Sequence, residues 1–179
     1  MTHLQRLGAA ALLGLSCLAS QAATVVVDVA GARSVNLQGE VGNTVWFVNI
    51  GAHAQLTSLD WAVALNAFAP SSLADMQVSF GSASGLDMIN LAPELLGYSG
   101  TLDLSGLGLG AGADGLLRIE FSETYKDFAI GVAEGEWVSG QFTLGVSAVP
   151  EPATASLALL GLGLLALRRR HGRPLAASA

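Results

Sequence analysis

The stretch LRIEFS, residues 117–122, alternates apolar and polar side chains without a break. The two sets are Leu117, Ile119 and Phe121 on one side and Arg118, Glu120 and Ser122 on the other. Side chains two residues apart lie on the same face of a β-strand. The stretch therefore predicts a strand with an apolar face in a core and a polar face in water.

The same two-residue period recurs along residues 23–147. It is visible at residues 24–29, 43–50, 61–65, 76–80 and 138–146. Gly, Asn, Asp and Pro separate these runs, and no segment shows a sustained helical period. Residues 23–147 are therefore predicted to form an all-β domain, an antiparallel β-sandwich like a jelly roll. Its polar positions, Gln77 and Ser79 among them, are predicted to face water.

Residues 1–22 have the three parts of a secretory signal peptide. Arg6 supplies a basic start, residues 7–19 are apolar, and small residues follow, ending in Ala22. We expect this segment to be a signal helix that enters the Sec translocon and is cut by signal peptidase after Ala22. Cys17, the only cysteine of the chain, leaves with it, which excludes disulfides and cysteine sites from the mature domain.

Acidic side chains dominate the chain between residues 23 and 149, although the formal net charge of the whole chain is only −6. This part has three basic and thirteen acidic residues, a difference of −10. Such a surface repels phosphates, which excludes nucleic acids as partners. Basic residues gather at the C-terminal end instead, and this asymmetry indicates a separate functional segment there.

The C-terminal segment begins with a four-residue motif. It consists of Val149, Pro150, Glu151 and Pro152. Each proline fixes its own φ and disfavours helix at the preceding residue, so the motif is predicted to be extended. We expect a processing enzyme to recognise the carboxylate of Glu151, which the prolines hold in position.

An apolar stretch without a charged residue, residues 153–167, comes next. As a helix it would be about 22 Å long, and bilayer thinning with snorkelling arginines can make up the difference from the roughly 30 Å hydrocarbon core. It is therefore predicted to be a transmembrane helix. Arg168, Arg169 and Arg170 follow and are predicted to hold residues 172–179 in the cytoplasm. A simple membrane anchor that no enzyme processes is the alternative.

Together, the Pro-Glu-Pro motif, the apolar helix and the arginine block resemble the PEP-CTERM sorting signal, over residues 148–171. This signal occurs on exported proteins of Gram-negative bacteria that make exopolysaccharide. The resemblance implies cleavage near the motif by an exosortase, a membrane-embedded enzyme similar to a cysteine transpeptidase. It implies a precursor anchored in the inner membrane and a product at the cell surface or in the extracellular matrix, where polysaccharide is a further partner.

For the β domain we predict a non-enzymatic structural or interaction role, with no catalytic residues, metal or cofactor. His53 is the only histidine between residues 23 and 149 and is predicted to lie in a loop. The glycine-rich stretch 97–115 lacks the strand-then-helix setting of a nucleotide site and is predicted to be a loop. Five acids between Glu120 and Glu136 are predicted to form a solvated face, with a calcium site as the alternative.

Two other functions of the β domain stay open at this point. A carbohydrate-binding module would present a row of exposed aromatic side chains on one concave face. A secreted hydrolase would bring two or three polar side chains together in one pocket, with shifted pKa values. Trp61 is predicted to lie in the core, whereas Trp46 and Trp137 are compatible with either the core or the surface.

Overall fold

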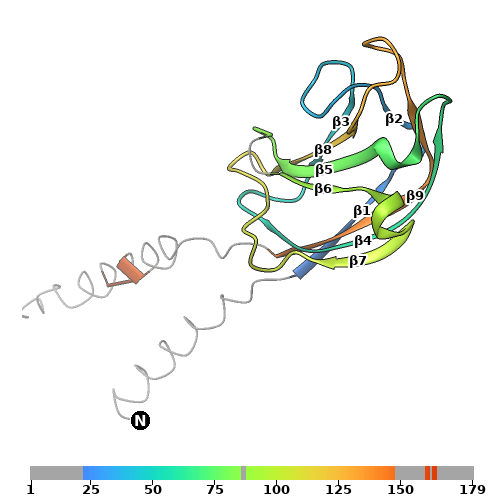
Figure 1. The fold of residues 1–179 in the computed structure, drawn as a ribbon. Helices are drawn as coiled ribbons and strands as arrows, with labels where there is room; N and C mark the ends of the chain where they lie inside the picture. Colours follow the sequence, from blue (N-terminus) through green and yellow to red (C-terminus); the bar gives the residue numbers. More distant parts are fainter. Residues whose placement is uncertain (1–21, 86–87, 148–159, 162, 165–179) are drawn as a thin grey trace, which may run out of the picture. The chain divides into compact units, whose positions relative to one another are not determined.

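The computed structural model describes residues 22–85, 88–147, 160–161 and 163–164, and within them nine strands form two antiparallel sheets (Figure 1). Sheet A contains β1 (Ala22–Asp28), β2 (Ala32–Ser34), β4 (Gln55–Ala67), β7 (Ser99–Asp103) and β9 (Gly135–Ser147). Sheet B contains β3 (Thr44–Asn49), β5 (Met76–Ser82), β6 (Met88–Leu91) and β8 (Leu116–Glu123). The prediction of an all-β, antiparallel domain is confirmed.

Sequence neighbours are mostly not sheet neighbours in this domain. Sheet A has the strand order β1-β9-β4-β7 with β2 beside β9, and sheet B has the order β3-β8-β5-β6. This order resembles that of a jelly roll, in which eight strands form two sheets. Because β9 is the last strand in sequence and lies between β1 and β4, sheet A is complete only when the end of the domain is in place.

The core lies between the two sheets and contains the apolar face predicted for β8. Phe121 of this strand lies edge-on to Trp137, with ring centroids 5.2 Å apart, and Phe142 lies 5.7 Å from Trp137. Trp61 is buried, as predicted, and Trp137 proves to be a core residue. Trp46 is half-buried and packs edge-on against Phe121 at 4.8 Å. The aromatic side chains therefore serve mainly to fill the sandwich.

Much of the polar face of sheet B is buried, contrary to the prediction. The residues buried there are Gln77, Ser79, Glu120 and Ser122. The segment 35–43 covers this face, where the N–H of Gly39 and the side-chain amide of Asn43 each donate to Oε1 of Glu120 at 2.8 Å. Alternation along a strand separates two faces, but it does not tell whether water or another part of the chain covers the polar one.

The two predicted flanking helices fall mainly outside the described residues. Of the expected signal helix in residues 1–22, only Ala22 is described, and it begins β1. Of the expected transmembrane helix in residues 153–167, only residues 160, 161, 163 and 164 are described, and these are helical. In the part of the chain that the structure describes, no helix is long and apolar enough to cross a membrane. The domain itself has two short helical turns, η1 (Leu73–Asp75) and α2 (Pro93–Leu96).

The glycine-rich stretch is held against the beginning of β4 by backbone hydrogen bonds. The N–H of Leu56 donates to the carbonyl of Leu109 at 2.8 Å, and the N–H of Ala111 donates to the carbonyl of Ala54 at 2.9 Å. Gly110 lies between these bonds, where a Cβ atom would come within 2.0 Å of the Ala54 carbonyl oxygen. Glycine is required here for the close approach of two backbones, not for binding a nucleotide.

Replacing Gly110 with alanine is expected to lower the free energy of unfolding by about 1–2 kcal/mol, because the two backbones must move apart. Denaturant titration of both proteins measures the difference. Gly112→Ala is the matched control, since the nearest atom to a Cβ there is Oδ1 of Asp114 at 3.5 Å. Equal stability of the two variants would contradict this account of Gly110.

Candidate functional site

Both predicted processing segments adjoin the same end of the sandwich. Ala22, the first residue of β1, pairs with Ser147, the last residue of β9, and Ala23 pairs with Val146. Ala22 is also the residue after which signal peptidase is predicted to cut. The two predicted cleavage events therefore act on chain segments that adjoin neighbouring strands of sheet A.

The predicted sorting residues lie outside the described residues. They are Val149, Pro150, Glu151 and Pro152, with Arg168, Arg169 and Arg170 further along. Their roles remain predictions. The structure does show that the last strand ends at Ser147, so the motif begins after the folded sheet has ended.

A buried ion pair lies in the loop between β8 and β9. Nζ of Lys126 is 2.6 Å from Oε1 of Glu134, and the glutamate side chain is fully buried. The backbone N–H groups of Asp127 and Phe128 also donate to the Glu134 carboxylate, at 3.1 and 2.9 Å. Burial favours the neutral acid, but the Lys126 hydrogen bond, the two backbone donors and the Lys126 charge outweigh it, so the pKa of Glu134 is lowered. Glu134 is therefore ionised at neutral pH.

The same lysine joins this loop to the segment 35–43. Its ammonium group donates to the carbonyl of Val35 and, at 3.2 Å, to the carbonyl of Val132. The Asn36 side chain accepts from the N–H of Gly131 at 3.1 Å. These bonds hold two segments that are far apart in sequence in one fixed arrangement.

Glu123 lies close to this ion pair without a partner of its own. The residue is 1% exposed, and neither carboxylate oxygen has a hydrogen-bond partner among the described residues. The pKa of Glu123 is raised to about 7, chiefly by desolvation on burial and to a smaller extent by the negative charges of Glu134 and Asp75. The hydroxyl of Ser34 and the charge of Lys126 favour the ionised form, but the Ser34 hydroxyl does not reach hydrogen-bond geometry. Close to neutral pH, a large share of Glu123 is uncharged.

The five clustered acids therefore do not form the predicted solvated face. Glu120, Glu123 and Glu134 are buried. Arg118 and Lys126 each lie 2.6 Å from a carboxylate oxygen, of Glu120 and Glu134 respectively, where a metal ion would otherwise bind. Within residues 22–85 and 88–147, no group of three His, Cys, Asp or Glu side chains could hold a metal ion. The arrangement gives the calcium alternative no support.

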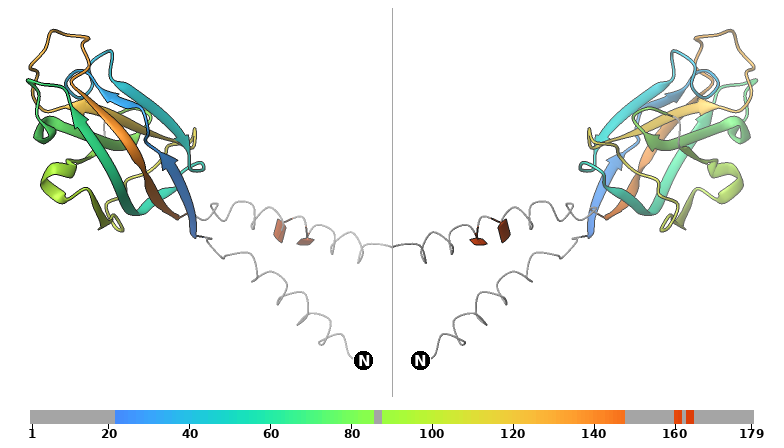
Figure 2. Two further views of the ribbon diagram at one scale, coloured as in Figure 1. Left: turned by 90° about the vertical axis from the view of Figure 1, so that its right-hand side faces the viewer. Right: turned by 90° about the vertical axis from the view of Figure 1, so that its left-hand side faces the viewer.

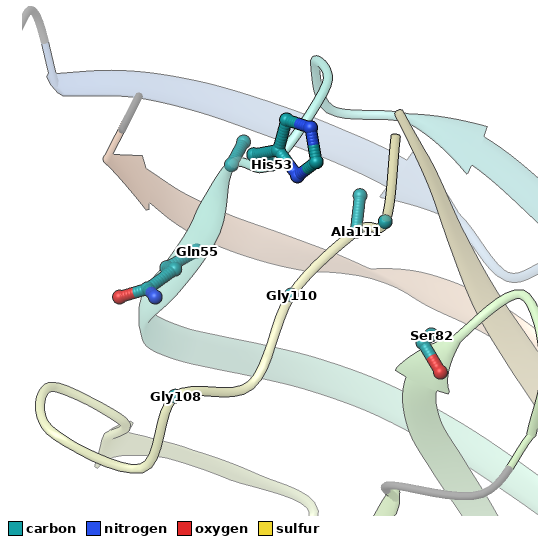
Figure 3. Close-up of a pocket in the computed structure, with 8 residues that line it drawn as sticks. His53, Gln55, Ser82, Gly108, Gly110 and Ala111 are labelled. Carbon is teal, nitrogen blue, oxygen red and sulfur yellow. The ribbon is translucent and has the colours of Figure 1, made fainter. Parts of the chain in front are cut away.

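An open pocket of about 460 Å³ lies between the start of β4 and the glycine-rich stretch (Figure 3). Its polar lining side chains are His53, which lies in the turn before β4 as predicted, Gln55 and Ser82. Figure 3 shows the segment from Gly108 to Ala111 running between His53 and Ser82. The Ser82 hydroxyl shares a hydrogen bond of 2.7 Å with the hydroxyl of Ser84, which is not one of the pocket's lining residues. The buried acids Glu123 and Glu134 are not among the residues that line this pocket.

The exposed aromatic side chains of the described domain do not form a row. Phe47 lies on β3, Tyr98 precedes β7, and Tyr125 follows β8. Strands β3 and β7 belong to different sheets, so these rings do not line one face. Along the described strands, the feature expected of a carbohydrate-binding module is missing.

Sequence reasoning missed the burial of Glu120, Glu123 and Glu134. For two of them a signal was available, because Arg118 and Lys126 are two of only three basic residues between positions 23 and 149. A cation that is rare in an acidic domain is a good candidate for a buried partner. Nothing in the sequence marks Glu123.

Comparison with protein families matches residues 148–173 to the PEP-CTERM protein-sorting motif. The match covers the Pro-Glu-Pro motif, the apolar stretch and the arginine block. No curated protein matches the chain. The matched residues lie entirely after the last strand of the β domain, which ends at Ser147.

Proposed function

We propose that the β domain is a non-enzymatic structural or interaction module of an exported protein. The PEP-CTERM protein-sorting motif supports this proposal, because it identifies the chain as an exosortase substrate. The β domain acts after export, at the cell surface or in the exopolysaccharide matrix. The tail holds the precursor in the inner membrane until the exosortase cuts it.

The single observation that carries the proposal is the sorting motif at residues 148–173. The end of the fold supports it, since β9 stops at Ser147 and every described strand precedes the motif. Cleavage beside Pro150 or Pro152 would therefore remove the anchor without cutting a strand. The central position of β9 makes this important, because shortening β9 would separate β1 from β4.

Each end of the chain has a role in the proposed route. The Sec translocon and signal peptidase act on residues 1–22, and the β domain folds outside the membrane. The exosortase recognises the carboxylate of Glu151 in its extended setting, while Arg168, Arg169 and Arg170 stay in the cytoplasm.

A non-enzymatic role agrees with the polar groups of the described domain. The ionisable side chains with strongly altered environments, Glu123 and Glu134, are buried and do not reach the open pocket. The pocket itself is lined largely by backbone and small side chains. A binding or scaffolding surface is therefore favoured over a reaction site.

The processing step predicts a difference in mass between two strains. With the exosortase present, most of the protein should lack its tail and leave the inner membrane fraction. In a strain without the enzyme it should keep the tail and stay there, as intact-mass spectrometry of fractionated cells would show. Glu151→Gln should reproduce the second result in the presence of the enzyme, because the recognised charge is gone.

Asp127→Asn is the matched control, because it removes one carboxylate charge from an exposed position of the folded domain. This variant should be processed like the natural protein. An intact tail in both strains would contradict the proposed processing. Normal processing of Glu151→Gln would show that the exosortase does not recognise the charge of Glu151.

A further inference from the structure

We propose that the free edge of β3 pairs with β3 of a second copy of this chain, so that two sheets B form one continuous sheet across a two-fold axis. Among the described residues β3 pairs with β8 alone, which leaves its other edge open. An open strand edge carries a row of backbone donors and acceptors that another strand can use.

The register of β3 shows which residues face that edge. The N–H of Ile50 donates to the carbonyl of Gly115 on the β8 side at 2.9 Å. Backbone groups alternate in direction along an antiparallel strand, so the odd-numbered residues of β3 face away from β8. Val45, Phe47 and Asn49 therefore present their N–H and C=O groups outward.

The two sides of the sandwich differ in how their edges are protected. On the side of β6 and β7, the turn α2 contacts β5, β7 and η1. On the other side, β1 and β3 border the sandwich along one margin (Figure 2), and β2, beside β9 with β1, contacts β3. The β1 and β3 edges have no such helical cover among the described elements. Natural edges are often protected by Lys, Pro or a bulge, and β3, with the sequence TVWFVN and an unbroken register, has none of these.

Charge points to a second copy as the occupant. The domain carries a difference of −10 between basic and acidic residues, so two copies repel each other over most of their surfaces. Residues 44–49 contain no charged side chain, which makes this edge a place where two copies can meet without opposing carboxylates.

The outward-facing residues also match one another across a two-fold axis through Phe47. Antiparallel pairing then sets Val45 opposite Asn49 of the second copy, Phe47 opposite Phe47, and Asn49 opposite Val45. All three pairs are hydrogen-bonded pairs, because each joins two outward-facing residues. The Phe47 side chain is 54% exposed in the single chain, and the pairing would bury two such rings against each other.

If the proposed function is right, this arrangement requires that pairing takes place after the exosortase has released the protein. The two-fold axis reverses the second copy, so the Ser147 ends of the two domains point in opposite directions. Two precursors anchored in one membrane by short tails could not both adopt it. Pairing would therefore follow release by the exosortase.

The test uses the exported protein collected after processing, which has lost Cys17 with the signal peptide, so that each cysteine variant has one thiol. Sedimentation equilibrium should show a concentration-dependent dimer. Phe47→Lys should raise the dimer dissociation constant about tenfold or more, because two ammonium groups then oppose each other. Val138→Lys is the matched control, since Val138 is 52% exposed on sheet A and its substitution should leave the constant unchanged.

A second measurement does not depend on affinity. Opposite residues of a hydrogen-bonded antiparallel pair have Cα atoms about 5.5 Å apart, which a disulfide can span. Phe47→Cys should therefore cross-link on mild oxidation, and Val138→Cys should not. A wild-type monomer at all concentrations with no excess cross-linking of Phe47→Cys would overturn the proposal. So would a dimer that is weakened by Val26→Lys on β1 but not by Phe47→Lys. Release that does not depend on the exosortase, together with dimerisation of the released protein, would refute the sorting function alone.

Discussion

Substituting Glu134 with glutamine is expected to lower the free energy of unfolding by about 3–5 kcal/mol, enough to leave a marginally stable domain partly unfolded. The buried carboxylate accepts from Lys126 at 2.6 Å and from two backbone N–H groups. Glutamine keeps the size of the side chain but removes its charge. The Lys126 ammonium would then be left largely buried without a counter-charge.

Urea denaturation at neutral pH measures this loss. The control is Glu136→Gln, because Glu136 also faces a basic residue, Arg33, but at 4.0 Å and with both side chains substantially exposed. An exposed pair of this kind contributes about 0–1 kcal/mol, so the control should stay close to the natural protein. Similar losses in both variants would show that the burial of the Lys126 pair is not what stabilises the loop.

The positions of the strands could be predicted well because their signal is local. Each alternating run lies within a few consecutive residues, and Leu117, Ile119 and Phe121 are buried between the sheets as their spacing indicates. Trp61 could be placed in the core on the same ground. The apolar positions of one strand are decided by that strand alone, whatever its neighbours in the sheet.

The environment of the polar positions could not be predicted, because it depends on contacts between distant parts of the chain. Glu120 accepts a hydrogen bond from Gly39, which lies 81 residues earlier. Strand order brings these residues together, and the alternation of β8 is the same whether its polar face meets water or the segment 35–43. The prediction of a solvated acidic face failed for this reason.

The candidate sites differ in the same way. The sorting motif is a contiguous stretch whose chemistry can be recognised without a fold, and the family comparison supports it at residues 148–173. The free edge of β3 and the isolated carboxylate of Glu123 are products of topology. A sequence pattern shows neither which strand lies at the edge of a sheet nor which glutamate is desolvated by burial.

Glu123 should make the domain less stable as the pH rises from about 4.5 to about 7. Its pKa is raised to about 7 in the folded chain from an ordinary value of 4.5. Between these two values the folded state holds a proton that the unfolded state has lost, so rising pH favours unfolding. The contribution is fully present below the unfolded pKa and is lost as the pH passes through the folded one. Glu134 acts in the opposite sense and at lower pH, because its pKa is lowered in the folded chain.

Urea unfolding measured at pH 5.5 and pH 8.0 tests the contribution of Glu123, because Glu123 of the folded protein loses its proton between these two pH values. The difference in Glu123 protonation predicts that the natural protein is about 2 kcal/mol less stable at pH 8.0. In Glu123→Gln the difference should largely disappear, and the variant should exceed the natural protein in stability at pH 8.0, because no charge has to be held without a partner inside the sandwich. Asp127→Asn, at an exposed position in the neighbouring loop, should keep the natural pH dependence. A natural protein with equal stability at both pH values would mean that Glu123 finds a partner when ionised, and a Glu123→Gln variant that keeps the full difference would assign the titration to another group.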